Sequence, residues 1–536
     1  MGVVVRGTLV RAAAAARLRL SLPARGAVAV AAWGARLVAL AALVPIAVYI
    51  WTALHRLDYP YELNWLEGGG VEIVRRVMQG KSLYTAPTLG YVSYTYTPFY
   101  AWVSAAVAEI TGIGFLPLRL VSFASSLVGI GVLWRLTLDA TGDRAAGAVA
   151  GGLFAASYSL TGWWFDVGRL DSLFVALTLL AFWLGRHAHG MRAGAIVGTV
   201  AFLAFFTKQI GLVAVVPALV WLASRRPRVG IIALGMLAAL LAGSTVLLDG
   251  LTHGWYRYYI VSELAGQPWD PRVWVGFWIH SLYRHLLPLD WLAALALVAS
   301  VAVRSRSRGR SDRGRALPAI LRRLQARQLG VGYELAAAAG LLLAAWFSRL
   351  HTGGFVNTLM PAYAACGLIG GLAFARLRRL GPVPAILATV LVLVQLAVLV
   401  TLPNDAIPHK SARAAGTELM ARLRMLPGPV LVLAHPWYGT LAGKGSFAQS
   451  DAIFEVLRSD DARGSAYLRR ELRHALDEYR IQVVVLDHPP PPYLATQLAH
   501  EFILQSRQIT ATILRPPSDL RSGPTFLYVR KPGKRA

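Results

Sequence analysis

Two glutamates stand in a polar, aromatic-rich segment that follows the first long apolar run of the chain. Glu62 and Glu67 belong to residues 58–70, and residues 91–100 add a tyrosine-rich stretch. A carboxylate is costly to keep charged beside lipid, so acids at such a place are candidates for chemistry. They could act as general bases that take a proton from a hydroxyl group. The alternative is that they are solvated loop residues.

The spacing of the two glutamates separates their expected roles. Because they are five residues apart, they would face different ways on one helix. We therefore expect one to point into a site and the other to be structural or solvated. Glu67 precedes Gly68, Gly69 and Gly70, whose missing side chains leave room for a ligand or for a close helix contact. Glu67 is the preferred base, and Glu62 is the second candidate.

Polar groups also stand at the ends of later apolar runs. Arg169 and Asp171 begin one run. They either pair with each other, or Arg169 meets a phosphate while Asp171 orients the site or holds a cation. Lys208 and Gln209 separate two further runs. Lys208 either extends to the membrane interface or captures an anionic headgroup.

A late apolar run opens with His351 and Asn357, which flank two glycines. Both side chains could donate hydrogen bonds to a ligand, and packing roles are equally open. The sequence contains no His-Glu-x-x-His pattern and no Gly-x-Ser-x-Gly pattern, which argues against a zinc enzyme and a serine hydrolase. Cys366 is the only cysteine, so a disulfide framework and a thiolate metal site are excluded.

The composition indicates a mostly α, polytopic membrane protein. Of the 536 residues, 56% are hydrophobic and only 15% are charged, against about 25% charged in soluble domains. Apolar runs of spanning length predict a bundle of about eleven membrane spans. They lie near residues 30–53, 118–136, 145–161, 170–185, 193–207, 209–223, 230–248, 286–303, 331–347, 356–374 and 383–402.

The charge pattern predicts the topology. The net charge is +27, with arginines clustered in short loops between the apolar runs. The positive-inside rule places these loops, and a basic segment at residues 1–29, in the cytoplasm. The loop 54–117 is then outside, with an interfacial helix at 98–111, because a span there would move the basic loop 304–327 outside. Nucleic-acid binding is not expected, whereas contact with anionic membrane lipid is.

The composition changes near residue 403. Helical patterns at 411–426 and 464–480 alternate with short strand patterns at 430–433, 483–487 and 526–529. This order predicts a small α/β domain with a partly parallel sheet. We therefore expect a transmembrane domain at 30–402 and an extracytoplasmic domain at 403–536, with docking or shielding as the favoured role of the latter.

The order of these motifs resembles the C-type membrane glycosyltransferases, which share the GT-C fold. The acidic loop is followed by a turn from Gly80 to Tyr84 and by a tyrosine-rich segment that includes Pro98. Arg169, Lys208 and the segment 353–361 then follow in the family's order. The chain is most similar to the bacterial family 39-like members, the protein O-mannosyltransferases and lipid A aminoarabinose transferases, over residues 30–400.

The resemblance implies an enzyme that takes a sugar from a polyprenyl-phosphate carrier. The acceptor would be a glycan, a lipid or a protein outside the bacterial cytoplasmic membrane. The family has an Asp-Glu pair where this chain has Leu66 and Glu67, so a role for Mg²⁺ or Mn²⁺ is left open. The implied roles are a base at Glu67, with Glu62 and Asp171 as further catalytic candidates; phosphate binding by Lys208, Arg169 and Gln209; and substrate binding by Tyr94, Tyr96, His351 and Asn357.

Two other functions compete with this interpretation. A transporter or flippase for a lipid-linked sugar would need a polar path across the bilayer. The ionisable residues gather instead on the predicted outer side, which favours chemistry at the membrane surface. A non-catalytic subunit of an envelope-assembly complex would leave that one-sided cluster unexplained.

Overall fold

Helices make up most of the computed structural model, which describes residues 24–308, 330–518 and 523–533. The predicted basic segment 1–29 lies largely outside these residues, as does most of the loop 304–327. The long and medium helices of the bundle are α2 Ala24–Arg56, α5 Phe115–Thr141, α6 Arg144–Ala156, α7 Asp171–His187, α8 Gly190–Thr207, α9 Gly211–Arg225, α10 Pro227–Leu251, α14 Arg284–Arg308, α16 Gly330–Leu350, α17 Met360–Arg378 and α18 Pro382–Leu399.

Eight helices of the described part are long and apolar enough to cross a membrane. The prediction of about eleven spans included three more, α6, α7 and α9, which have 13, 17 and 15 residues. At 1.5 Å per residue such helices reach about 20–26 Å, less than the roughly 30 Å hydrocarbon core. They pack among the longer helices, and all of α6 after Arg144 is buried. The protein is a multi-pass membrane protein.

Two short helices follow the first long one. The first is α3 Glu67–Met78, which begins at the glutamate itself. The helix expected at 98–111 is α4 Phe99–Thr111. Each has at most 13 residues, too few to span a bilayer. Together they bring the tyrosine-rich segment against α5 and α8.

The C-terminal part contains a four-stranded sheet in the order β1-β2-β4-β3. Its strands are β1 Val430–Val432, β2 Val483–Leu486, β3 Phe502–Ser506 and β4 Phe526–Arg530. β1 and β2 are parallel, with Val432 opposite Val485, and the other pairs are antiparallel. The three predicted strands and the partly parallel sheet are confirmed, whereas β3 was not predicted.

Helices surround this sheet. They are α19 Lys410–Met425, α20 Pro436–Leu441, α21 Ser450–Arg458, α22 Ala462–Leu472, α23 Ala475–Glu478 and α24 Pro492–Glu501. The single helix predicted at 464–480 is two helices, because the chain turns between α22 and α23. The boundary near residue 403 stays a prediction.

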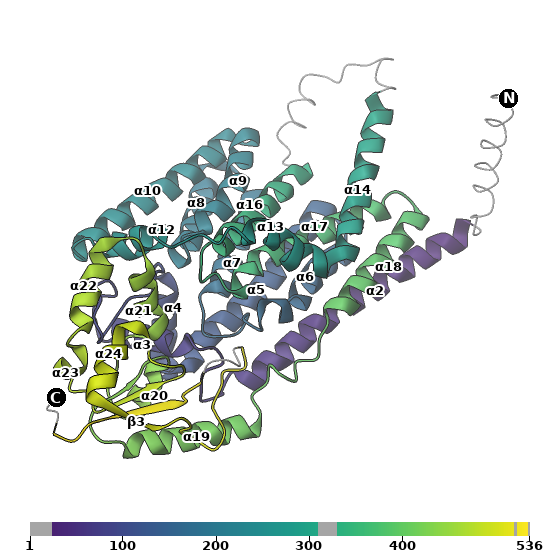
Figure 1. The fold of residues 1–536 in the computed structure, drawn as a ribbon. Helices are drawn as coiled ribbons and strands as arrows, with labels where there is room; N and C mark the ends of the chain where they lie inside the picture. Colours follow the sequence, from purple (N-terminus) through teal and green to yellow (C-terminus); the bar gives the residue numbers. More distant parts are fainter. Residues whose placement is uncertain (1–23, 309–329, 519–522, 534–536) are drawn as a thin grey trace, which may run out of the picture.

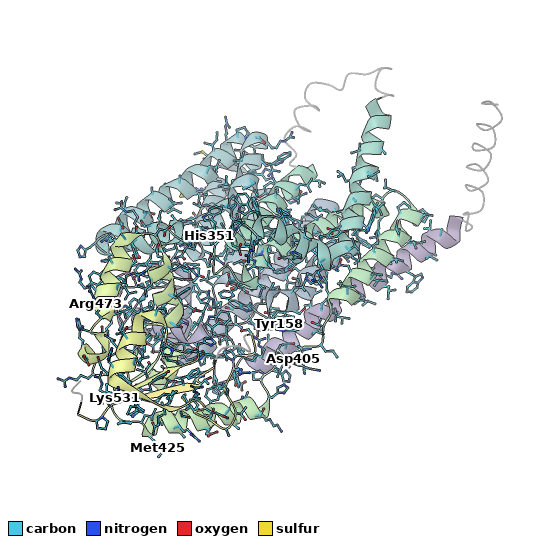
Figure 2. All side chains as sticks on the ribbon, viewed as in Figure 1. Tyr158, His351, Asp405, Met425, Arg473 and Lys531 are labelled. Carbon is cyan, nitrogen blue, oxygen red and sulfur yellow. The ribbon has the colours of Figure 1, made fainter. Side chains whose placement is uncertain are left out.

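The C-terminal part lies at the end of the bundle where α2 ends, close to α3 and α4 (Figure 1). Met425 and Lys531 lie at the edge of this part that is farther from the bundle (Figure 2). Hydrogen bonds join it to several loops of the bundle: Trp65 to Asp451, Leu89 to Glu471, Gly266 to Asp460 and Thr352 to Arg458. The loops predicted to share one side of the membrane therefore meet here; which side that is stays a prediction.

Candidate functional site

A buried arginine organises the loop between α2 and α3. Arg119, in the first turns of α5, has no exposed surface. Its guanidinium donates to the backbone carbonyls of Arg56, Tyr59 and Tyr61 at 3.3, 2.6 and 2.6 Å. It also donates to both carboxylate oxygens of Glu67, at 3.1 and 2.8 Å. One side chain from a predicted span thus fixes the path of the acidic loop.

Glu67 is held on every side by hydrogen-bond donors. Besides Arg119, the backbone amides of Leu63 and Gly168 donate to its oxygens at 2.7 and 2.6 Å. Burial alone would raise the pKa of Glu67, but the charge and hydrogen bonds of Arg119 and the two amides hold it below the usual value. A fully satisfied carboxylate with a lowered pKa is a weak base, so the geometry argues for a structural role.

The three glycines of α3 accept close neighbours rather than leaving empty space. A side chain at Gly68 would collide with the carboxylate of Glu62, and one at Gly69 would collide with the hydroxyl of Tyr94. A side chain at Gly70 would approach Leu118. The close contact expected here is therefore present, and it brings Glu62 and Tyr94 to adjacent positions along one short helix.

Glu62 belongs to a buried chain of three titratable groups. One of its oxygens is hydrogen-bonded to Nδ1 of His435, whose Nε2 lies 2.9 Å from a carboxylate oxygen of Asp487. The other oxygen, Oε1, has no hydrogen-bond partner among the described residues. Burial is the main cause that raises the pKa of Glu62, to about 7, although His435 opposes it. Such a carboxylate is suited to accept a proton near neutral pH.

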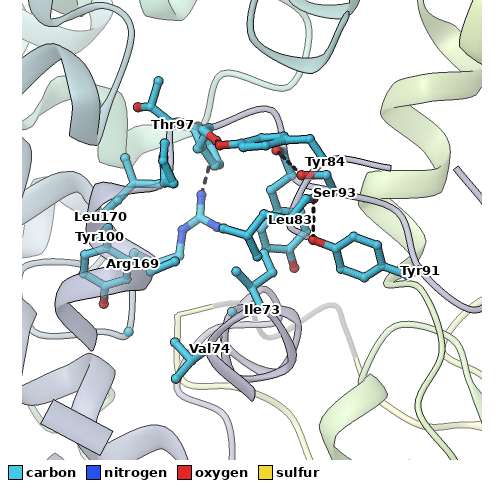
Figure 3. Close-up of a pocket in the computed structure, with 16 residues that line it drawn as sticks. Ile73, Val74, Leu83, Tyr84, Tyr91, Ser93, Thr97, Tyr100, Arg169 and Leu170 are labelled. Atoms are coloured by element: carbon cyan, nitrogen blue, oxygen red, sulfur yellow. Dashed lines mark hydrogen bonds between the residues drawn. The ribbon is translucent and has the colours of Figure 1, made fainter. Parts of the chain in front are cut away.

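A cavity lies beside the glycine end of α3, with about 520 Å³ of space that includes its opening to solvent. Its walls combine apolar side chains with five tyrosines: Tyr84, Tyr91, Tyr94, Tyr96 and Tyr100. Ile73 and Val74 of α3 close one side, and Arg169 reaches into the middle (Figure 3). Apolar walls around a few polar groups are typical of ligand pockets.

Arg169 is the cation of this cavity. Its side chain is buried, with 5% of its surface exposed. Nη2 donates to the hydroxyl of Tyr96 at 3.1 Å, whereas Nε has no hydrogen-bond partner in the described part of the chain. The rings of Tyr94, Tyr96 and Trp164 lie 5.3–6.0 Å from the guanidinium carbon. A buried cation with an unused donor requires an anionic partner.

Asp171, Lys208 and Asn357 form a separate cluster at the start of α7. The ammonium of Lys208 lies 2.7 Å from one oxygen of Asp171, and the amide of Asn357 donates to the other at 3.0 Å. Arg169 and Asp171 are near each other but are not paired. The charges of Lys208 and Asp171 thus neutralise each other, and each oxygen of Asp171 accepts one hydrogen bond.

The remaining predicted residues have other surroundings. The side-chain amide of Gln209 donates to the carbonyl of Thr95 at 2.6 Å, so it supports the tyrosine segment. His351 packs against Trp269, with ring centroids 5.0 Å apart. Its contacts are with this loop, and the structure does not bring it to the Arg169 cavity.

The sequence prediction missed three residues of this region: Arg119, His435 and Asp487. Arg119 left a signal, because an arginine beside an apolar run is costly and needs a partner. His435 follows β1 closely and Asp487 follows β2 directly. Because the carboxyl ends of parallel strands meet at one sheet edge, the predicted strands could have placed these two side chains together.

A divalent cation does not fit these residues. Among the described residues there is no group of three or more His, Cys, Asp or Glu side chains arranged to hold a metal. Glu67 is paired with Arg119 and Asp171 with Lys208, so each of these carboxylates already has a cationic partner. We derive no chemical step through a metal.

Part of the sequence matches a known protein family. Residues 95–248, less than half of the chain, match the family described as dolichyl-phosphate-mannose-protein mannosyltransferase. No curated protein matches the sequence.

Solved structures match a much larger share of the chain. ArnT from Cupriavidus metallidurans, bound to undecaprenyl phosphate, has a TM-score of 0.56 at 15% identity, covering 92% of this chain and 98% of that one. The oligosaccharyltransferase AglB from Archaeoglobus fulgidus, in complex with an inhibitory peptide and a dolichol-phosphate, has a TM-score of 0.44 at 12% identity, covering 83% and 69%. The likeness to ArnT establishes the fold expected from the sequence, the GT-C fold of membrane glycosyltransferases.

Proposed function

We propose that this chain is a membrane glycosyltransferase that moves a sugar from a polyprenyl-phosphate carrier to an extracytoplasmic acceptor. The observation that carries the proposal is Arg169, a buried guanidinium whose Nε finds no acceptor in the described part of the chain and which lines a cavity of apolar and tyrosine side chains. An isoprenoid phosphate offers the two matching parts, an anion and an apolar tail. The family match and the undecaprenyl phosphate bound to ArnT support this donor class.

In this mechanism Arg169 stabilises the departing phosphate. Negative charge grows on the phosphate oxygen as its bond to the anomeric carbon breaks, and a fixed buried cation is most effective there. Asp171 and Lys208 neutralise each other within hydrogen-bonding distance. We therefore assign them to holding α7 and its preceding loop in position, with Asn357 as their support and Gln209 as a support of the tyrosine segment, rather than to direct contact with phosphate.

Glu62 is the base in this mechanism. Its free oxygen Oε1 takes the proton of the acceptor hydroxyl, and the hydroxyl oxygen bonds to the anomeric carbon as the carbon–phosphate-oxygen bond breaks. The polyprenyl phosphate leaves as the anion held by Arg169. Because Glu62 is buried in this structure, the acceptor must enter between α3 and the C-terminal part. Glu67 is assigned to fixing the loop.

The tyrosines of the cavity suit the sugar. Tyr94 lies at the glycine end of α3, and Tyr96 is hydrogen-bonded to Arg169, so both adjoin the proposed phosphate position. Aromatic rings can pack on the apolar face of a sugar while hydroxyls bind its polar edge. The sugar, whether hexose or pentose, and the acceptor are left open by these contacts.

Reconstitution with a panel of radiolabelled polyprenyl-phosphate sugars tests the proposal, with a bacterial envelope extract as the acceptor source. We expect label to enter the acceptor from at least one donor, and Arg169→Gln to lose both transfer and undecaprenyl phosphate binding. Movement of intact donor across a vesicle membrane without transfer would contradict the proposal and favour a flippase.

A further inference from the structure

The edge of the C-terminal sheet meets the acidic loop at one point. His435 and Asp487 stand at the carboxyl ends of β1 and β2, the two parallel strands. In open α/β sheets this edge is where functional groups converge. Here it faces Glu62, and the backbone amide of Glu62 donates to the hydroxyl of Tyr438 at 3.0 Å.

We propose that the C-terminal part completes the transfer site, with His435 and Asp487 as positioning residues that orient and tune the Glu62 carboxylate. This inference rests on the proposed function, because it takes Glu62 as the base. It gives the C-terminal part a role in orienting the base, whereas the sequence favoured a docking or shielding role.

The geometry is one in which a second side chain, His435, holds the base Glu62 in a fixed orientation. His435 has 1% of its side chain exposed and touches both carboxylates, Glu62 through Nδ1 and Asp487 through Nε2. Its ring also stacks on Tyr438, with centroids 5.3 Å apart. Held from three sides, the imidazole binds one oxygen of Glu62, while the other, Oε1, lies beside Gly68 and has no hydrogen-bond partner among the described residues.

The charges of the triad explain how the carboxylate is tuned. Burial disfavours an imidazolium, but Asp487 and Glu62 raise the pKa of His435 well above its usual value. The two acidic neighbours therefore favour the imidazolium form of His435. That positive charge lowers the pKa of Glu62, which burial would otherwise raise further.

Other titratable groups also face the triad. Glu67 on α3, which is paired with Arg119, carries a negative charge that tends to raise the pKa of Glu62, and Asp487 has the same effect. Tyr94 adjoins Glu62 from the tyrosine segment and Tyr438 from α20, and both hydroxyls stay protonated because their pKa values are raised. Asp451 on α21 faces Asp487 and also has a raised pKa.

The test compares His435→Gln with the wild type in the full-length protein. The glutamine side chain in this variant would retain a hydrogen bond to Glu62 but would carry no positive charge, so the pKa of Glu62 would rise. We expect kcat at pH 7 to fall at least about fivefold and the acidic limb of the pH profile to move to higher pH by about one unit or more. The KM for the donor and the Kd for undecaprenyl phosphate should not change.

Two further variants separate tuning from stability. Asp487→Asn keeps the volume of the side chain and should lower kcat without changing the donor KM. His488→Gln alters the exposed neighbouring imidazole and should leave activity at the wild-type level. A lower melting temperature of His435→Gln with an unchanged pH profile would overturn the inference and leave a purely structural bridge. Absence of wild-type transfer from every donor would instead overturn the proposed function, and this inference with it.

Discussion

Arg119 and Glu67 form a buried ion pair in which the guanidinium Nη2 lies 2.8 Å from the carboxylate Oε2, with neither side chain exposed. The pair joins the start of α5 to the start of α3. The remaining donors of Arg119 bind backbone carbonyls of the loop that carries Glu62. Arg119 therefore anchors the loop of the proposed base directly, while its partner Glu67 supplies the counter-charge and does not itself react.

Breaking this pair is expected to destabilise the protein. Glu67→Gln leaves the Arg119 charge buried without a counter-ion, at a cost of about 3–5 kcal/mol. Arg119→Lys loses the forked geometry and should have a similar effect. Thermal unfolding in detergent measures both variants, with the exposed Arg257→Gln as the control, since its side chain is 65% exposed. A Glu67→Gln protein that is as stable as the wild type but inactive would identify Glu67, not Glu62, as the base.

Loss of the Arg169 guanidinium is expected to weaken donor binding. A hydrogen bond to a charged group contributes about 1.5–3 kcal/mol, so Arg169→Gln should raise the Kd for undecaprenyl phosphate roughly 10- to 150-fold. Titration in detergent at fixed salt measures the change, and Arg257→Gln again serves as the control. Unchanged affinity in a folded Arg169→Gln protein would exclude this arginine as the phosphate ligand.

Methyl groups on the glycines of α3 are expected to displace the site. Gly68→Ala would press on the Glu62 carboxylate and Gly69→Ala on the Tyr94 hydroxyl, so each should lower the transfer rate at least tenfold. Gly131→Ala in α5 meets nothing within 4 Å and should behave like the wild type. The rates are compared after the folded fraction is measured by gel filtration. Full activity of both α3 variants would show that this packing is not needed.

Asp171 and Lys208 are expected to be coupled in stability. Asp171→Asn and Lys208→Gln each leave the partner's charge buried and unpaired, which costs several kcal/mol. The double variant should lose less than the sum of the two single variants, with a coupling of about 1–3 kcal/mol. Thermal unfolding of the four proteins gives this coupling. Strictly additive losses would mean that the pair does not act as a unit and that Lys208 is free for phosphate.

Much of the fold follows from patterns within single segments. Apolar runs locate the long helices, and the charge pattern predicted which loops would share one end of the bundle. The apolar runs alone did not separate short helices from spans, because α6, α7 and α9 are as apolar as spans yet end after 13–17 residues. Edge strand β3 alternates between buried and exposed residues, a weak signal over five positions.

The candidate site could be predicted only in part, because its contacts join distant segments. Residue types pointed to Arg169, Asp171 and Lys208, but spacing could not show that Lys208 pairs with Asp171 across 37 positions. Likewise, Glu67 looked like the better base beside its glycines. Only the fold reveals that Arg119 saturates it and that His435, 373 positions from Glu62, leaves that carboxylate with one free oxygen.

The most direct test of the central claim is a single-turnover transfer assay on Glu62→Gln and Glu67→Gln, each corrected for its folded fraction. General-base catalysis contributes about 10²–10⁴-fold, so Glu62→Gln should lose that much in rate while still binding undecaprenyl phosphate. The wild-type rate should increase as the pH rises through about 7, where Glu62 loses its proton. Folded Glu67→Gln should keep most of its rate. Wild-type turnover in Glu62→Gln, together with loss of turnover in folded Glu67→Gln, would contradict the account.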